Sequence, residues 1–366
     1  MDDAETVELA GLVTAAQGGD GAAFGRLVER FRPELQLHCY RMLGSLDDAE
    51  DTVQDVLLQA WRSLPGFEGR ASVRTWLYRI ATNACLGRRV RDRRHRLLAS
   101  ARISADPGLP VAATVPWLQP CPDGLLDQVA ARDPDPASIL AARETVEIAF
   151  VAALQHLPPR QRAALVLRDV VGWSAERSAT ALDTTVASAN SALQRARATL
   201  RRQLGDRRSE WTAAAGHEAT AAERELVRRY IDAIESADDA AIGAVLADDA
   251  VVSHQPGAGG NETHAAAAYS GRATIIEAWA PALHSPVPLE MRMVAVAANR
   301  QPAVVSYVRL PGTTGHRAFA LSLLRLDGGR VVEVANFVPE GLAAYGLPDV
   351  LSDVLLDGWP EGPRLS

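Results

Sequence analysis

The sequence predicts two helical domains followed by an α+β domain, and three observations support this prediction. Before residue 102, and again from 139 to 208, apolar residues recur every three or four positions, the spacing of one helix face. Seven prolines between residues 107 and 136 interrupt that pattern. Beyond residue 217, helical stretches give way to a run of strand-like segments, an order typical of α+β folds.

The 366 residues are enough for two or three domains with cores of their own. We place the predicted boundaries where the apolar spacing changes. The segments are a helical domain over 1–102, a proline-rich linker over 103–138, a second helical domain over 139–208 and an α+β domain over 217–350.

The first helical domain has its best-defined element between residues 48 and 64. Ser45 and Asp48 fit a capping box at its N-terminal end. Val53 and Val56 begin an apolar face with helical spacing. Pro65 and the glycine that follows end the helix.

Positive charge is concentrated in two places, although the whole chain carries a formal net charge of -7. Residues 70–102 contain ten arginines and one acid, and residues 195–208 contain six arginines and one acid. Attraction to phosphate depends on the local field and not on the chain total. The two clusters therefore favour a nucleic-acid surface, with a pair of solvated helix ends as the alternative.

The linker over 103–138 is expected to be extended and partly stiff because of its prolines. One short apolar stretch, residues 115–118, contains Trp117 and Leu118. A tryptophan is unusual in a solvated linker, so we expect this stretch to dock on a neighbouring domain.

The second helical domain predicts a helix-turn-helix. A turn over 172–174 precedes a short helix that Ser174 can cap and that ends near Leu182. After Asp183, a longer helix begins, with one apolar face and one face of serine, glutamine and arginine. Two helices joined by a tight turn, the second with a polar face, are typical of this DNA-binding motif.

The last domain is expected to alternate helices, strands and turns. A glycine-rich loop is expected over 257–260, and a tight turn over 327–330 joins the last two strands. Helices are predicted over 223–236 and 273–280, and strands over 250–252, 291–298, 303–310, 316–326 and 331–338.

Several classes of protein are excluded by composition. No apolar run reaches the ~18 residues that a membrane helix needs, and the acidic, polar N-terminus does not fit a secretory signal. Cys39, Cys85 and Cys121 are odd in number and far apart, which argues against a disulfide framework and a zinc site. We expect a cytoplasmic protein without a metal, a cofactor or catalytic residues.

Three segments resemble the bacterial extracytoplasmic-function (ECF) sigma factors, which direct RNA polymerase to promoters. Residues 47–56 with Ala60 and Trp61 look like the helix that binds core polymerase. Residues 75–83 are similar to the segment that recognises and melts the minus-ten element. Residues 157–162 and 194–197 resemble the region that reads the minus-thirty-five element. The likeness follows the order and spacing of the family over about residues 1–204.

This resemblance implies that the acidic face of the helix over 48–64 binds core RNA polymerase. Carboxylate and amide oxygens on that face can accept hydrogen bonds from basic partner residues. An ordinary solvated face is the alternative. The polymerase-binding residues implied are Asp48, Glu50, Asp51, Gln54 and Asp55.

The same resemblance implies two contacts with promoter DNA. The loop over 67–72 and the next helix would trap an unstacked base and hold the single strand, with Trp76 and Tyr78 either stacked on DNA or buried. The helix after residue 185 would read base edges in the major groove. The DNA-binding residues implied are Phe67, Arg70, Ser72, Arg74, Arg79, Asn83, Arg88, Arg89, Thr185, Ser188, Ser191, Gln194, Arg195 and Arg197.

The DNA-reading helix departs from the family at two places. Residues 190–192 replace a usual Lys-Ser-Arg run, which removes two cations. Asp183 stands where the turn usually has glycine, so it must adopt the left-handed conformation. We therefore expect an upstream DNA contact that is weak and depends on polymerase.

Residues 269–279 resemble SnoaL-like domains of the NTF2-like superfamily, a cone-shaped α+β fold. Some sigma factors with this tail carry one motif in the linker and one in the tail, which residues 117–120 and 327–330 resemble. The resemblance implies interdomain roles for Trp117, Leu118, Asp327 and Arg330. Some SnoaL relatives are enzymes, but His254 and His264 have no clear carboxylate partner here. A group of aromatic residues is a candidate site for a small apolar ligand, namely Tyr230, Tyr307, Phe319 and Phe337.

These observations favour an alternative sigma factor with a regulatory tail. Two helical modules on a stiffened tether would contact opposite ends of a promoter, and core RNA polymerase would supply the chemistry. The alternative is a SnoaL-type enzyme with a helical targeting module. The sequence gives no sign for or against an anti-sigma partner.

Overall fold

The computed structural model describes residues 3–103, 110–130, 147–204 and 220–352, apart from 264 and 288. Its contacts divide the chain into two compact units. The helical unit consists of Met1–Arg94, Leu125–Thr145 and Ala153–Gly205. The sheet unit consists of His95–Gly124, Val146–Ala152 and Asp206–Ser366.

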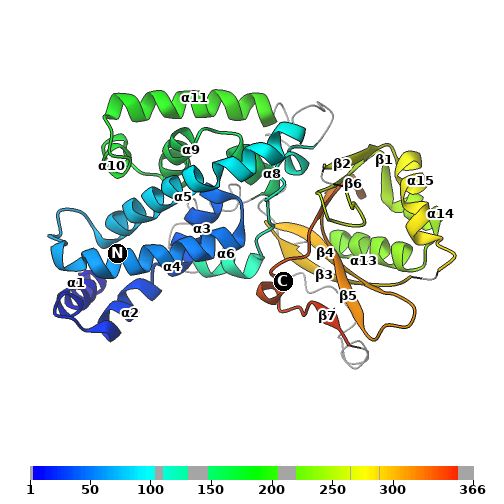
Figure 1. The fold of residues 1–366 in the computed structure, drawn as a ribbon, viewed down its shortest axis with the longest axis horizontal. Helices are drawn as coiled ribbons and strands as arrows, with labels where there is room; N and C mark the ends of the chain where they lie inside the picture. Colours follow the sequence, from blue (N-terminus) through cyan, green and yellow to red (C-terminus); the bar gives the residue numbers. More distant parts are fainter. Residues whose placement is uncertain are drawn as a thin grey trace. The chain divides into compact units, whose positions relative to one another are not determined.

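The first part of the helical unit is all helix, as predicted. Ser45 caps α4, because its Oγ accepts a hydrogen bond from the Asp48 amide at 3.1 Å. Gly44 ends α3 in the left-handed conformation, with φ of 75°. The helices are α1 (Asp3–Gln17), α2 (Gly21–Glu29), α3 (Arg32–Leu43), α4 (Leu46–Ser63) and α5 (Val73–Ile103), with a 3₁₀ turn at Leu64–Gly66 (Figure 1).

The second part of the helical unit contains the predicted helix-turn-helix. Ser174 caps α10 by accepting from the Arg177 amide at 3.2 Å, as expected. Asp183, in the turn before α11, has a φ of 49°, so it adopts the left-handed conformation that the sequence required. The helices are the end of α8 (Ile148–Gln155), which this unit includes from Ala153, and α9 (Pro159–Leu165), α10 (Ala175–Ala181) and α11 (Val186–Leu204), with a π-helical turn at Val166–Val170.

The two helical parts pack against each other, whereas the sequence predicted separate modules on a tether. Arg162 of α9 is fully buried and donates to the carbonyl oxygen of Met42 in α3. A donor from the second part thus bonds a carbonyl oxygen at the carboxyl end of α3, where the helix itself supplies no donor. Local sequence patterns cannot reveal such a long-range pairing.

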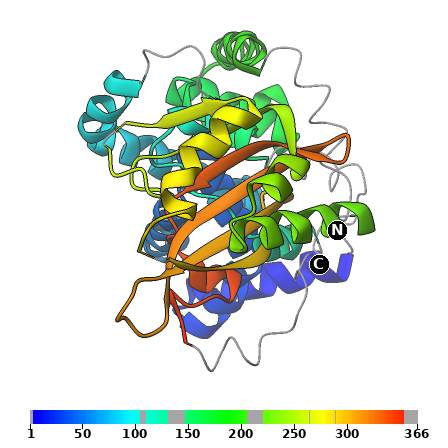
Figure 2. The same ribbon diagram turned by 90° about the vertical axis from the view of Figure 1, so that its right-hand side faces the viewer.

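In the sheet unit, three helices cover one face of a twisted sheet (Figure 2). Leu226, Ile242 and Ile275, one from each helix, share a core with Val304 and Leu324 of the sheet. The helices are α13 (Ala221–Glu235), α14 (Asp239–Val245) and α15 (Arg272–Leu283). The strands are β1 (Leu246–His254), β2 (Ala267–Ser270), β3 (Glu290–Ala298), β4 (Gln301–Arg309), β5 (His316–Asp327), β6 (Arg330–Phe337) and β7 (Val350–Leu351).

The sheet order is β2-β1-β6-β5-β4-β3, and β7 pairs with β5. Strands β3 to β6 form an antiparallel meander, and β1 joins β6 in parallel. This is the predicted α+β arrangement. The short strands β2 and β7 were not predicted, because β2 has four residues and β7 two, below the length at which alternation becomes visible.

The predicted linker is more ordered than expected at two places. Residues Val111–Thr114 form a 3₁₀ turn, and Asp123–Ala130 form α6. The proline-rich composition predicted an extended chain, but Asp123 stands at the first position of α6, where an acid favours the helix dipole.

Candidate polymerase and nucleic-acid interfaces

One face of α4 carries exposed acceptor groups, and the opposite face is buried. Val53 and Val56 are 2% and 0% exposed, so they anchor the helix in the core. Glu50, Gln54 and Asp55 are exposed. Since the polymerase-facing residues predicted from the sequence include these three, the helix presents the implied surface to solvent.

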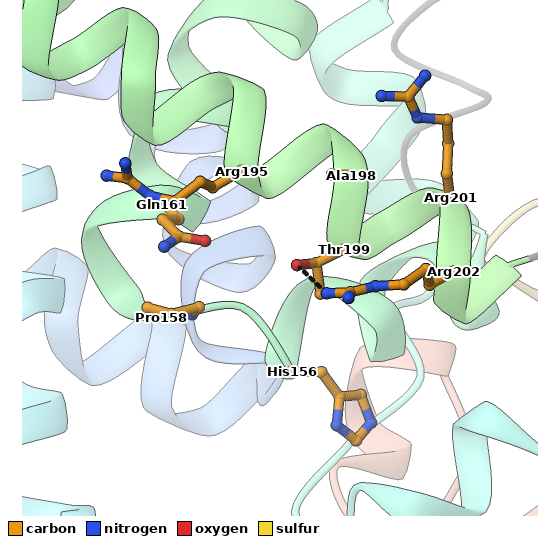
Figure 3. Close-up of a pocket in the computed structure, with 8 residues that line it drawn as sticks. All are labelled: His156, Pro158, Gln161, Arg195, Ala198, Thr199, Arg201 and Arg202. Carbon is orange, nitrogen blue, oxygen red and sulfur yellow. Dashed lines mark hydrogen bonds between the residues drawn. The ribbon is translucent and has the colours of Figure 1, made fainter.

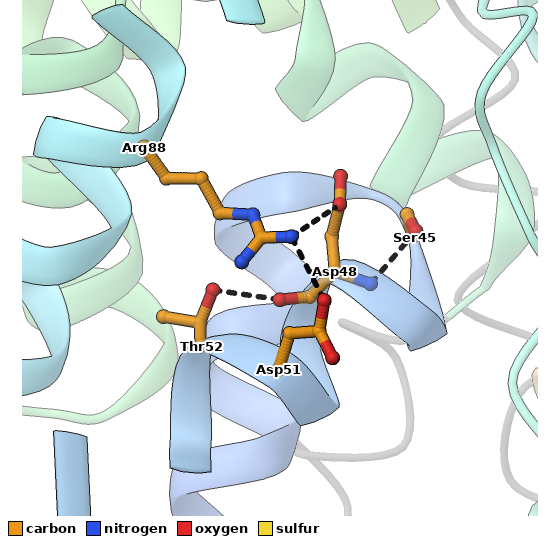
Figure 4. A network of polar contacts seen from close by, with 5 residues as sticks. All are labelled: Ser45, Asp48, Asp51, Thr52 and Arg88. Carbon is orange, nitrogen blue, oxygen red and sulfur yellow. Dashed lines mark hydrogen bonds and ion pairs between the residues drawn. The ribbon is translucent and has the colours of Figure 1, made fainter. Parts of the chain in front are cut away.

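Arg88 of α5 neutralises part of this acidic surface (Figure 4). Its Nη2 lies 3.1 Å from Asp48 Oδ1 and 3.1 Å from Asp51 Oδ2. The hydroxyl of Thr52 donates to the Asp48 carbonyl oxygen at 2.6 Å. Arg88 was predicted to contact DNA; in this structure it is bonded to α4, and the DNA contact stays a prediction. Glu50, Gln54 and Asp55 make no such bond among the described residues, so they are the free acceptors of the face.

The loop after α4 is held by local contacts. Phe67 packs on Trp76 with ring centroids 5.0 Å apart. Ser72 accepts a hydrogen bond from the Thr75 amide at 3.2 Å, which makes it the cap of α5. Gln17 of α1 donates to the Phe67 carbonyl oxygen at 2.8 Å. Phe67 and Ser72 thus help to shape the loop, and their contact with DNA stays a prediction.

The polar side chains near this loop differ in their exposure and in whether they are bonded to an acid. Arg79 and Asn83 are exposed on α5, and Arg70 is exposed beside Glu68. Arg74 is not free, because its Nε donates to Glu34 at 2.7 Å. The side chain of Arg89 lies outside the described residues.

The exposed face of α11 combines hydroxyl, amide and guanidinium groups. Ala189, Leu193 and Ala196 are buried on the opposite face. Thr185 caps the helix by accepting from the Ser188 amide at 3.1 Å. The exposed side chains include all the residues predicted for this helix, namely Thr185, Ser188, Ser191, Gln194, Arg195 and Arg197.

Arg197 is held by Asp169 through two hydrogen bonds, from Nε at 2.8 Å and from Nη2 at 2.7 Å. The bidentate pairing raises the pKa of Arg197 and fixes the guanidinium beside the turn that precedes α10. Arg195 makes no comparable pairing among the described residues, so it keeps its donors for an external acceptor.

A basic cavity of about 640 Å³ continues this surface toward the carboxyl end of α11 (Figure 3). Arg202 donates to Thr199 at 3.3 Å, and Arg201 extends from the same stretch of helix. None of the lining residues is acidic, so the cavity suits a phosphate or another anion. The lining residues are His156, Pro158, Gln161, Arg195, Ala198, Thr199, Arg201 and Arg202.

The linker docks on the sheet unit, as expected for residues 115–118. Gln255, at the end of β1, donates through Nε2 to the carbonyl oxygens of Val115 at 2.8 Å and Leu118 at 3.1 Å. Leu118 and Gln255 are 1% and 3% exposed. Trp117 is only half-buried. The attachment therefore includes the buried Gln255 amide and the buried Leu118 side chain.

A second attachment holds the turn between β3 and β4. Asn299 and Arg300 have positive φ angles of 55° and 60°, a backbone conformation that residues other than glycine adopt at a cost in free energy. The Asn299 amide donates to the Cys121 carbonyl at 2.8 Å, and the Cys121 amide donates to Asn299 Oδ1 at 2.7 Å. The Arg300 amide donates to Asp123 Oδ1 at 2.8 Å. The linker thus stabilises an otherwise unfavourable turn.

The predicted tail motif lies elsewhere in the sheet unit. Arg330 donates through Nη1 to the carbonyl oxygens of Ala244 at 2.7 Å and Leu246 at 3.3 Å. Asp327 is exposed at the β5–β6 turn. Arg330 therefore joins β6 to the end of α14 inside the tail, and the interdomain role stays a prediction.

The described residues do not assemble a catalytic or metal centre in the tail. His254 is buried edge-on against Tyr269, with ring centroids 6.0 Å apart, and burial lowers its pKa. His264 lies outside the described residues. In the part of the chain that the structure describes, no group of three His, Cys, Asp or Glu side chains could hold a metal. No helix in that part has the length and apolar character that a membrane crossing requires.

Family models match three segments of the chain. Sigma-70 region 2 matches residues 27–96, Sigma-70 region 4 matches residues 147–200, and a SnoaL-like domain matches residues 227–334. The first two cover the helical unit's α3–α5 and α8–α11, and the third covers most of the sheet. The protein is therefore a sigma factor fused to a SnoaL-like domain.

Similar proteins give the narrower family. The ECF RNA polymerase sigma factor SigG of Mycobacterium tuberculosis is 40% identical over 333 residues, which span 90% of this chain and 85% of that protein. SigW of Bacillus subtilis is 28% identical over 188 residues, which span 51% of this chain and 92% of that protein. The chain belongs to the ECF RNA polymerase sigma factors, a family of transcription initiation factors and not of enzymes.

A solved structure has a similar fold over most of this chain. The crystal structure of the M. tuberculosis ECF sigma factor SigJ covers 87% of this chain and 98% of its own, with a TM-score of 0.53 and 20% identity. This likeness confirms the predicted fold class of helical sigma domains followed by an α+β domain.

Sequence reasoning missed the residues that hold the surfaces in place. Arg162 appeared only as part of a family motif, and Asn299 did not appear at all. Two successive residues with positive φ and no glycine are invisible in sequence, although Asn at a hairpin turn is a weak signal. Arg162 gives no local signal, because its partners in α3 are 120 residues away in the chain.

Proposed function

We propose that the free acceptors of α4 bind core RNA polymerase and that the exposed face of α11 binds the upstream promoter element. The observation that carries the proposal is the presence of two exposed helix faces of opposite character on one chain. Glu50 and Asp55 offer exposed carboxylates, and Arg195 offers an exposed guanidinium that has no acidic partner among the described residues. A cytoplasmic initiation factor needs both kinds of surface, because it binds core RNA polymerase and promoter DNA.

The loop over 67–72 and the exposed groups of α5 are proposed to contact the melted minus-ten element. Arg70, Arg79 and Asn83 are exposed and suit the single-strand backbone and an unstacked base. Arg89 remains a proposed contact from the sequence. Phe67 and Ser72 are proposed to act by holding the loop.

Upstream, Ser188, Ser191 and Gln194 are proposed to face base edges, and the basic cavity is proposed to hold the DNA backbone. These three residues lie on the side of α11 that is opposite its buried face. Arg195 and Arg202 supply exposed cations further along α11 than residues 190–192.

Run-off transcription from genomic fragments with core polymerase tests the function. We expect a transcript only when the full-length protein is present, and we expect Arg195→Ala to lower its amount by about tenfold on a promoter with an upstream element. Arg224→Ala, a change at the start of α13 in the tail, is the control. Failure of the wild-type protein to yield any transcript would refute the proposal.

We further propose that the docked linker lets the SnoaL-like domain modulate promoter output. Gln255 and the Asn299 turn hold residues 115–123 at defined places on the sheet unit. The linker joins the two sigma regions, so its attachment limits how they can be arranged. A small ligand in the tail remains a prediction; it would act only by favouring the docked or the released linker.

Gln255→Ala is expected to lower promoter output at least threefold while leaving the affinity for core polymerase unchanged. The change removes the amide that donates to both linker carbonyl oxygens, and it leaves the Leu118 carbonyl oxygen without this donor in a buried site. Multiple-round transcription and a polymerase-binding assay measure the two quantities. Gln128→Ala, on the exposed side of α6, is the control. Equal output from both variants would argue against modulation by linker docking.

A further inference from the structure

The N-terminal helix α1 precedes the segment that matches Sigma-70 region 2, which begins at residue 27. It nevertheless packs against the loop between α4 and α5. Ala16 of α1 shares a small buried core with Leu64 at the end of α4. Phe67 from the loop and Trp76 from α5 pack against this core. The aromatic pair of the loop is therefore supported by a helix to which neither the sequence nor the family match assigns a role.

Gln17, the last residue of α1, bonds the backbone at the start of this loop. Its Nε2 donates to the carbonyl oxygens of Leu64 at 3.2 Å and Phe67 at 2.8 Å. The Phe67 amide also donates to the Leu64 carbonyl oxygen, at 3.0 Å. A primary amide carries two N–H groups on one nitrogen, so Gln17 can donate to both carbonyl groups at once. One side chain thus fixes the turn that leads from α4 into the loop.

The other end of the loop is fixed by Ser72, which accepts hydrogen bonds from the Thr75 and Trp76 amides at 3.2 and 3.0 Å. Residues 68–71, between the two ends, are exposed and make no backbone hydrogen bond among the described residues. Gly69 has a φ of 71°, which bends the exposed chain. The loop is therefore a short exposed span between two anchored ends, and Gln17 holds the first of them.

Capture of an unstacked base requires such a loop to keep one shape. Fixing a mobile backbone at the moment of binding costs conformational entropy. A loop that already has its bound shape in the free protein avoids much of that cost, so it binds more tightly without any additional contact. The two bonds from Gln17 and the packing of Phe67 provide this kind of preorganisation.

We propose that Gln17 is a positioning residue for promoter melting, which presets the loop between α4 and α5 in the shape that captures a base of the minus-ten element. This inference rests on the proposed function, because it requires the loop over 67–72 to contact the melted strand. Gln17 acts through the loop and not by touching DNA, since it is half-buried and its Nε2 is bonded to the loop carbonyl groups.

Gln17→Met tests the proposal in the full-length protein bound to core polymerase. Methionine has an unbranched side chain of similar length and lacks both donors. The probes are single-stranded oligonucleotides that carry either strand of the minus-ten element, taken from a promoter identified by run-off transcription. We expect the affinity for the bound strand to fall about fivefold, the effect of one lost hydrogen bond, and the affinity for core polymerase to stay unchanged.

Thr14→Val is the matched control for this substitution. Thr14 lies one turn earlier on α1 and is exposed, and its hydroxyl donates to the Ala10 carbonyl oxygen of the same helix at 3.0 Å. The variant therefore loses a bond inside α1 and none to the loop. Its affinity for the oligonucleotide should match that of the wild type.

An abasic site in the oligonucleotide separates positioning of the loop from a general loss of stability. Each minus-ten nucleotide is replaced in turn, which leaves the loop no base to hold at that position. At the captured base, we expect the lesion to weaken binding less in Gln17→Met than in the wild type, since the variant has already lost part of that contact. Thr14→Val should lose as much as the wild type. If Gln17→Met also lowers the polymerase affinity, Gln17→Glu, which keeps the shape of the amide and lacks its N–H donors, is measured in the same way.

Two outcomes would overturn the role of Gln17. Strand affinity of Gln17→Met equal to that of Thr14→Val would show that the loop keeps its shape without the two bonds. Equal losses from the abasic site in Gln17→Met and the wild type at every position would show that Gln17 acts independently of base capture. Absence of both transcript and strand binding with the wild-type protein would instead refute the proposed function, so the two failures are distinguishable.

Discussion

Replacing Asp55 with arginine is expected to weaken binding to core RNA polymerase at least tenfold, about 1.4 kcal/mol. Asp55 is exposed on α4 and makes no ion pair among the described residues. Its carboxylate is therefore available to a basic partner, and reversal of its charge replaces attraction by repulsion at the same place. Equilibrium binding of labelled protein to core polymerase measures the change.

Glu277→Arg supplies the matched control for this charge reversal. Glu277 is exposed on α15 in the tail, so the variant has the same net charge as Asp55→Arg. Its polymerase affinity should stay within about twofold of the wild type. Asp51→Arg should have a smaller effect than Asp55→Arg, because Arg88 already occupies Asp51. Equal losses for Asp55→Arg and Glu277→Arg would show that total charge, and not the α4 face, governs binding.

Local rules predicted most of the fold. The cap at Ser45 and the stop at Pro65 define α4, because caps and breakers act within a few residues of their own position. Strands β3 to β6 were predicted to within about three residues, because each runs for eight residues or more between turns. The helix α6 was missed since proline-rich surroundings outweighed a short apolar stretch.

The candidate surfaces were predicted in outline but not in detail. Helical spacing placed Ser188, Ser191 and Arg195 on the exposed side of α11, and the structure shows them exposed. Spacing could not reveal that Arg88 pairs with α4 or that Arg197 pairs with Asp169, since these partners lie 28 to 40 residues apart in the chain. Whether an arginine is free for DNA depends on such tertiary pairings.

The largest expected loss of stability comes from Arg162→Met. Methionine fills a similar volume but donates no hydrogen bonds, so the carbonyl oxygens of Met42, Gln155 and Leu157 lose a donor in a site that is fully buried. Unpaired buried acceptors cost about 1–3 kcal/mol each, and removal of a buried charge offsets part of that cost. We expect the free energy of unfolding of the helical unit to fall by about 3 kcal/mol.

Urea unfolding followed by far-ultraviolet circular dichroism measures this loss, and Arg160→Met is the control. Arg160 lies two residues earlier on α9 and is exposed, so its replacement should change the free energy of unfolding by less than about 0.5 kcal/mol. Arg162→Lys should fall between the two, because an ammonium group keeps the charge but cannot reach acceptors on both helical parts. Similar unfolding curves for Arg162→Met and Arg160→Met would mean that the carbonyl groups find other donors, and that the buried guanidinium does not hold the second helical part in shape.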